Sequence, residues 1–272
     1  MTSKRAASPV ITPEALAEQI SAAKLVASEP VARYALGLGD DALILAQRLG
    51  EWIAHAPELE EDIALGNIGL DLLGHARSLL SYAGSAWGMA EDDLAYFRDE
   101  PEFRCHQLFE QPIGDFAQTI ARQLIASAYF HGLYRSLGRS ADPTLAAIAA
   151  KAVKEIDYHL DHSSQWLLRL GLGTEESARR MQRGLDAMWP FVDELFRRQP
   201  EIEELDGIAV DPASLRPAFD QLVPRLIVEA GLSVPTTGSA RGGGRQGVHS
   251  EALGPLLAEM QVLARAHPGE AW

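Results

Sequence analysis

The stretch that decides the fold runs from Glu58 to Tyr82 and reads ELEEDIALGNIGLDLLGHARSLLSY. Pro57 stands just before it, and the acidic residues at its start favour the first turn of a helix. Its apolar residues form two stripes at helical spacing: Leu59, Ile63, Leu70, Leu73 and Leu80, and then Leu65, Ile68, Leu72, His75 and Leu79. A helix that is apolar on two sides is typical of one buried among neighbours, so we expect both stripes to be covered.

Further helical stretches lie on both sides of this one, and strand patterns are nearly absent. We expect helices at 13–27, 31–54, 58–82, 112–137, 143–170, 174–198, 213–230 and 250–266. Asp142 with Pro143, and Thr174, are the clearest start signals. Short links join the first two long helices and the last two, and the long connection 84–111 joins the pairs. The sequence therefore predicts an all-α, ferritin-like four-helix bundle with one long crossover and extra helices at both ends.

Three segments follow from this layout. Residues 1–29 are expected to be a partly helical N-terminal extension, 30–235 the ferritin-like bundle, and 236–272 a glycine-rich connection with a C-terminal helix. A flexible connection is the favoured interpretation of the glycines, ahead of an anion or CoA contact, because the Gly-Lys-Ser/Thr ending of a phosphate loop is missing. The last helix either docks on a partner or packs back on its own bundle, and the pattern leaves both open.

Composition limits the class of protein. The chain has 272 residues, 47% of them hydrophobic, and a net charge of −14. Such an acidic surface disfavours nucleic acid as a partner. We find no apolar run long enough to cross a membrane and no signal peptide in residues 1–12. The single cysteine, Cys105, is expected to be a buried structural thiol, which suits a reducing compartment and a cytoplasmic protein.

A metal site would lie on the second and fourth helices of the bundle. Ferritin-like diiron proteins take a carboxylate from each of two helices and a Glu-x-x-His from each of the other two. Here Leu72 precedes His75 by three residues, and Ile156 precedes His159 in the same way. Both histidines are present and both glutamates are replaced, so the positions are typical of a vestigial site without a catalytic or metal-binding role.

The other two helices give no better ligands. Ser127 stands about where the third helix would supply a carboxylate, and serine is a poor iron ligand. On the first helix either Gln47 or Glu51 faces the site, and the pattern does not choose between them. We expect no metal and no cofactor in this chain. Ordinary core histidines at 75 and 159 are the plain alternative, and they would be equally inert.

A metal-binding alternative uses a different spacing. Asp71 with His75, and Glu155 with His159, are i, i+4 pairs that put two ligands on one helix face. A single Zn or Fe held by all four is the alternative function, a diiron or single-metal oxygenase with its own active site. The i, i+3 spacing of diiron proteins argues against it.

Several long strings resemble one family. They are residues 54–65 and 67–74, then 110–112, 115–117 and 119–123, then 154–155 and 158–160, 207–212, 253–255, 257–261, 268–269 and Trp272. These strings are similar to the C-type subunits (PaaC) of phenylacetyl-CoA epoxidase, the ring 1,2-epoxidase of phenylacetate degradation, over roughly residues 30–272. This sequence departs from the family at Ser127 and His75, where Asp and Gln would be expected.

The resemblance implies a structural subunit of an O2- and NADPH-dependent multicomponent monooxygenase. In that family the A-type subunit holds the diiron centre and binds the CoA thioester, whereas the C-type subunit binds no iron and stabilises it. The two form a heterodimer that dimerises again into a heterotetramer. A B-type subunit and a flavin and iron–sulfur reductase are further expected partners, and a homodimer is expected for the isolated chain.

Overall fold

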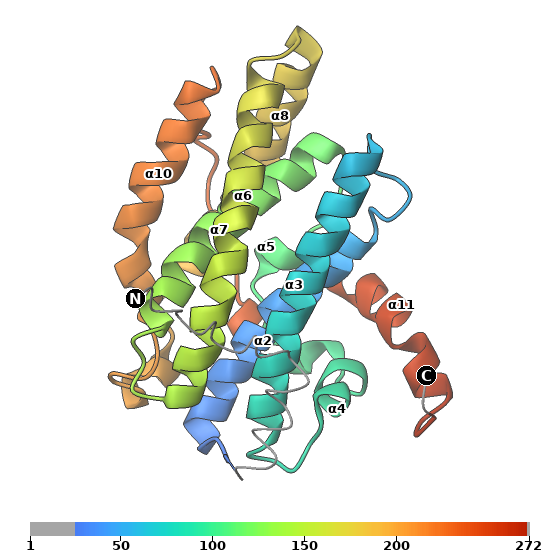
Figure 1. Ribbon diagram of the computed structural model, residues 1–272, viewed down its shortest axis with the longest axis vertical. Helices are drawn as coiled ribbons and strands as arrows, with labels where there is room; N and C mark the ends of the chain where they lie inside the picture. The colour runs from blue at the N-terminus through green and yellow to red at the C-terminus, as the bar shows by residue number, and fades with distance from the viewer. Residues whose placement is uncertain (1–24, 271–272) are drawn as a thin grey trace, which may run out of the picture.

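Residues 25–270 are described by the structure, a computed structural model, and every regular element in this part of the chain is a helix (Figure 1). The long helices are α2 (Glu29–Gly50), α3 (Leu59–Gly84), α6 (Phe116–Leu137) and α7 (Pro143–Gly171). The shorter ones are α4 (Glu91–Tyr96), α5 (Gln107–Glu110), α8 (Glu175–Met188), α9 (Val192–Leu195), α10 (Arg216–Glu229) and α11 (Leu253–Ala266). Single 3-10 turns are η1 (Glu100–Glu102), η2 (Trp189–Phe191), η3 (Pro200–Glu204), η4 (Pro212–Leu215) and η5 (Gly244–Gln246). The all-α prediction is confirmed.

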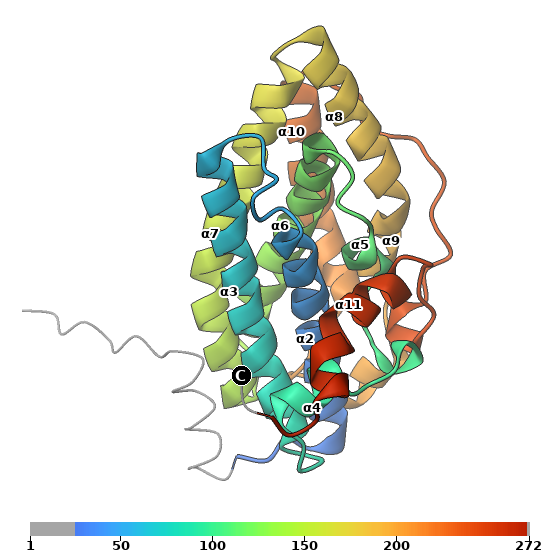
Figure 2. The ribbon, with the colours of Figure 1, turned by 90° about the vertical axis from the view of Figure 1, so that its right-hand side faces the viewer.

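Two helical hairpins build the bundle. Helix α2 packs along α3, α6 packs along α7, and α3 also meets α7 (Figures 1 and 2). The crossover between the hairpins carries α4, η1 and α5. Helices α8 and α10 cover α6 and α7 on the side away from α3. This arrangement is the predicted ferritin-like bundle with one long crossover. None of the helices in the described part is long and apolar enough to span a membrane.

Helix starts follow the capping residues. Asp142 accepts hydrogen bonds from the backbone N–H of Thr144 and Leu145, both at 2.9 Å, as its sequence predicted. Helix α6 begins at Phe116 instead of near Pro112, because Asp115 is the residue that caps it by accepting from the Gln118 N–H at 3.0 Å.

The expected helix 174–198 is not continuous. Thr174 caps α8 as predicted, accepting from the Ser177 N–H at 3.1 Å, but α8 ends at Met188. Pro190 follows, and it has no N–H to continue the helical ladder. The chain tightens into the turn η2 and resumes as the short α9.

One of the two apolar stripes of α3 is only partly covered. The stripe that includes Leu65, Leu72 and His75 is buried, as expected. In the other stripe, Leu80 is buried, but Leu59 is 71% exposed, Ile63 56% and Leu70 66%. The prediction that both stripes are buried is therefore wrong for the N-terminal part of this stripe, which the described helices that contact α3, namely α2, α4 and α7, leave uncovered.

The C-terminal segment packs back on its own bundle. Helix α11 lies against α4 and η1, with Leu253, Leu256 and Leu257 buried, while Leu263 faces outward (Figure 2). Arg245, in the glycine-rich connection before this helix, forms an ion pair with Asp41 of α2. The helix expected at 13–27 lies outside the described residues except for its last three, 25–27, which are not helical.

Candidate functional site in the bundle core

Two histidine–carboxylate pairs link α3 to α7 across the bundle. His75 Nε2 lies 2.6 Å from Glu155 Oε2, and His159 Nε2 lies 3.0 Å from Asp71 Oδ2. The i, i+4 spacing puts an acid and a histidine on one face of each helix. Because α3 and α7 come together along these faces, each acid binds the histidine of the other helix.

A third pair of the same kind lies nearby. His162 Nε2 is 2.9 Å from Glu61 Oε2, again between α7 and α3. Burial lowers the pKa of His159, and its hydrogen bond to Asp71 only partly opposes this. A neutral imidazole beside a carboxylate carries its proton on the nitrogen that faces the acid, so Nε2 of His159 donates to Asp71.

The positions at which the sequence analysis placed the diiron ligands carry two apolar residues and a serine. Leu72 is 1% exposed, Ile156 is fully buried and Ser127 is 2% exposed. The Nδ1 atom of His75 and the hydroxyl of Tyr134 are both buried without a hydrogen-bond partner, and the two rings are 5.4 Å apart. A diiron centre needs several carboxylates to neutralise its charge, and the donor set present here does not fit it.

The four ligands of the single-metal alternative form two separate pairs, Asp71 with His159 and Glu155 with His75. The side chains of Asp71 and Glu155 are 35% and 28% exposed, whereas their histidine partners are buried. These four residues are not among the groups in the described chain whose ligand atoms converge. These residues form interhelical hydrogen bonds that hold α3 against α7.

The first-helix candidates lie near the end of α2. Glu51 follows the last residue of α2 and accepts from Arg48 at 2.6 Å. Arg48 also binds the carbonyl groups of Glu110 and Ala252. Glu51 is therefore part of the contact between α2, the crossover and the C-terminal segment. The choice of Gln47 for the core face remains a prediction.

A buried charge network, which the sequence analysis missed, surrounds the middle of α2. Asp40 and Asp41 are fully buried. Arg98 from the crossover binds both oxygens of Asp40, at 2.5 and 3.0 Å. Arg245 from the glycine-rich segment binds Asp41 at 2.6 Å, and His106 approaches the same carboxylate at 3.1 Å. The feature of the sequence that could have predicted this network is the pair of adjacent acids, Asp40 and Asp41, in a mostly apolar part of α2.

The charges around Asp41 keep it ionised. Burial by itself would raise the pKa of this carboxyl, but Arg245 and then His106 outweigh burial and lower it. A buried ion pair adds little net stability, whereas the loss of one partner leaves an uncompensated charge. The network therefore fixes the position of the crossover and of the C-terminal segment on α2.

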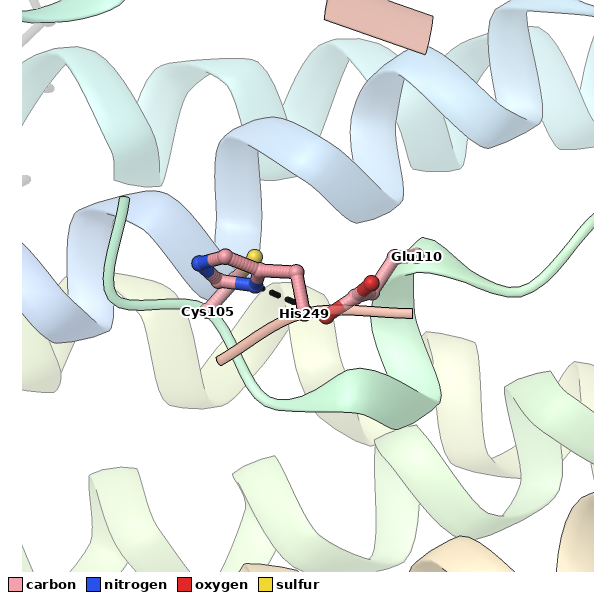
Figure 3. A group of neighbouring side chains, drawn as sticks. All are labelled: Cys105, Glu110 and His249. Atoms are coloured by element: carbon pink, nitrogen blue, oxygen red, sulfur yellow. Dashed lines mark hydrogen bonds and ion pairs between the residues drawn. The ribbon is translucent and has the colours of Figure 1, made fainter. Parts of the chain in front are cut away.

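Cys105, Glu110 and His249 form the one group in the described chain whose ligand atoms lie close enough together for a metal ion (Figure 3). The chemistry of the group is that of a hydrogen-bond network. His249 Nδ1 is 2.9 Å from Glu110 and Nε2 is 3.1 Å from the Phe103 carbonyl. Ser250 donates both its N–H and its hydroxyl to the other oxygen of Glu110.

The protonation states of this group oppose metal binding. Burial, followed by the charges of Glu110, Asp40 and Asp41, raises the pKa of the Cys105 thiol well above its usual value, so the thiolate that a metal needs is disfavoured. Burial also works against a charged His249, but Glu110 outweighs it and raises the pKa of the imidazole. Both ring nitrogens face acceptors, which fits an imidazolium. The expected buried thiol at Cys105 is confirmed.

The fold is that of a ferritin-like helical protein, with Leu72 and Ile156 buried in its core. Residues 6–272 match the family described as phenylacetic acid catabolic protein, and the chain belongs to this family. It is 52% identical over 246 residues to the C-type subunit of 1,2-phenylacetyl-CoA epoxidase from Escherichia coli (strain K12). That alignment covers 88% of this chain and 98% of the relative. The resemblance noted from the sequence is confirmed.

Proposed function

We propose that this chain is the non-catalytic C-type subunit of a phenylacetyl-CoA 1,2-epoxidase and that it stabilises the diiron-bearing A-type subunit in phenylacetate catabolism. The observation that carries the proposal is the pair Leu72 and Ile156, which are buried where the two metal-binding glutamates of a diiron bundle would stand. The histidines that remain, His75 and His159, are used as interhelical hydrogen bonds. The chain then holds no metal or cofactor, and the chemistry belongs to its partner.

The exposed stripe of α3 supports the assignment to a complex. Leu59, Ile63 and Leu70 lie on one face of a long helix, and each is more than half exposed. Exposed apolar patches of this kind mark protein–protein contact sites, and permanent contacts are more apolar than transient ones. We therefore assign this face to the A-type subunit. The B-type subunit, the reductase and a homodimer of the isolated chain are further partners in this proposal.

The cellular setting belongs to the same proposal. Cys105 is a free, fully buried thiol, which is compatible with a reducing cytoplasm. A cytoplasmic location would also place the chain in one compartment with an NADPH-consuming reductase.

Co-expression with and without the A-type subunit tests the proposal. We expect the two chains to purify together and the iron to follow the A-type subunit. The chain alone should contain far less than one iron ion per molecule by elemental analysis and should not epoxidise phenylacetyl-CoA. About two iron ions per chain after reconstitution, or turnover by the chain alone, would contradict the proposal.

A further inference from the structure

A cavity of about 610 Å³ opens between the first half of α2, the crossover, α6 and the segment that follows α9. Its apolar and aromatic walls include Tyr34, Leu36, Trp87, Met89, Tyr129 and Val210. Small-molecule sites commonly have volumes of about 300–1,000 Å³. The cavity is separate from the α3–α7 interface that carries the histidine pairs. Arg98, His106 and Arg245 of the buried charge network form part of its wall.

The charged residues that line this cavity are mostly arginines. Within the described chain the lining contains five arginines and two glutamates, although the whole protein has a net charge of −14. Three of the arginines are neutralised: Arg98 by Asp40, Arg245 by Asp41 and Arg33 by Glu29.

Arg104 is one of the two arginines of the lining that are not neutralised by a carboxylate. Its Nη1 donates to the carbonyl oxygens of Pro101 and Phe103, both at 2.7 Å. In the described part of the chain no carboxylate lies within ion-pair distance of it. Carbonyl groups hold a guanidinium in place without neutralising it, so Arg104 presents a positioned positive charge at the cavity.

Arg197 is the second. It donates to the carbonyl oxygens of Arg241 and, at 3.1 Å, Ala240. Glu194 lies near Arg197, since both side chains approach the same point beside Gly242, but it forms no ion pair with this arginine. Its two oxygens accept from the backbone N–H groups of the crossover and of the glycine-rich segment. Among the described residues Arg197 has no ion pair either. Two guanidinium groups held by carbonyls beside an apolar cavity favour a ligand with a negative group, because charge-assisted hydrogen bonds to it would be strong.

We propose that this cavity binds a small organic anion, a carboxylate or phosphate carried on an apolar body. The negative group lies between Arg104 and Arg197, and the body lies against Tyr34, Leu36 and Tyr129. The inference does not rest on the proposed function, because binding is measured on the chain alone and needs neither the A-type subunit nor turnover.

Calorimetric titration of the full-length chain with four matched probes tests this. Octanoate and octyl phosphate carry the apolar body and the charge, 1-octanol carries only the body, and inorganic phosphate carries only the charge. We expect saturable binding, with one site per chain, for octanoate, octyl phosphate or both. The better anion should bind at least about tenfold more tightly than 1-octanol, as expected for a hydrogen bond to a charged group. A preference for octanoate or for octyl phosphate identifies which anion the site takes.

Variants assign the binding to this cavity. Arg104→Gln and Arg197→Gln should each weaken binding by about tenfold. Leu36→Trp should abolish binding by filling the cavity while leaving both arginines in place. Arg225→Gln, on the exposed surface of α10, is the control and should bind like the wild type. If circular dichroism shows that Arg104→Gln does not fold, Arg197→Gln and Leu36→Trp still test the proposal. The proposal is overturned if no anion binds, if 1-octanol binds as tightly, or if Arg197→Gln and Leu36→Trp both leave affinity unchanged.

Discussion

Arg245 and Asp41 are 204 positions apart in the sequence, and their side chains meet at 2.6 Å in the interior (Nη2 to Oδ2). The same guanidinium also donates to the carbonyl oxygens of Gly37 and Arg104, each at 2.5 Å. A side chain at Gly37 would collide with it, which explains a glycine inside α2. This one arginine therefore joins the glycine-rich segment, the crossover and α2.

Replacing Arg245 by Met should lower the free energy of unfolding by about 3–5 kcal/mol, because Asp41 is left as a buried unpaired charge. Urea unfolding followed by circular dichroism measures the change. In the double variant with Asp41→Asn the loss should be smaller than the sum of the two single losses. Arg241→Met, an exposed arginine of the same segment, is the control. Equal unfolding midpoints for Arg245→Met and wild type would contradict the role given to this pair.

The stability supplied by His249 should depend on pH. Glu110 raises the pKa of this imidazole in the folded state, so the folded protein holds the proton more tightly than the unfolded chain does. The contribution is then fully present below the unfolded pKa of about 6.5 and is lost as pH rises through the higher folded value. His249→Gln should cost about 1–3 kcal/mol in the acidic range and less at alkaline pH. His55→Gln, at an exposed histidine, should show no such difference, and a penalty for His249→Gln that grows with pH would contradict the assignment.

The histidines of the α3–α7 interface should matter for stability and not for turnover. His75→Ala removes the buried partner of Glu155, and we expect a loss of about 1–3 kcal/mol in unfolding free energy. Epoxidation by the assembled complex should stay within about twofold of wild type, because no transition-state contact is lost. Glu155→Gln keeps the shape of the pair and should cost less stability. A fall of about 100-fold in turnover with the complex still assembled would show that this interface takes part in catalysis.

The exposed face of α3 should be required for assembly. Leu70→Asp places a charge in the proposed contact and should weaken co-purification with the A-type subunit by at least about tenfold. The fold should persist, since Leu70 is 66% exposed in the isolated chain. Leu172→Asp is a matched control, because Leu172 is 65% exposed and lies at the end of α7, outside this face. Unchanged co-purification of Leu70→Asp would move the interface to another surface.

The sequence by itself determined the helical class of the protein and most of its helix starts. Helix starts such as Asp142 depend on hydrogen bonds between residues two or three positions apart, so local spacing is enough to predict them. The absence of a ligand at Leu72 and Ile156 can also be predicted from the sequence, because a hydrocarbon side chain cannot bind a metal wherever it points. The interruption at Pro190 could also have been predicted, because a proline inside an expected helix interrupts it. The apolar pattern on both sides of Pro190 instead favoured one continuous helix.

Only the tertiary structure decided which residues meet across the bundle. The spacing placed Asp71 and His75 on one face of α3, but whether they share a metal or bind partners on α7 depends on how the two helices align. The exposure of Leu70 depends in the same way on which neighbours flank α3. The contact of Arg245 with Asp41 closes a loop of 204 residues, and no local pattern specifies it. The reason is physical: hydrogen bonds within a helix are set by short-range spacing, whereas pairing between helices is set by packing over the whole bundle.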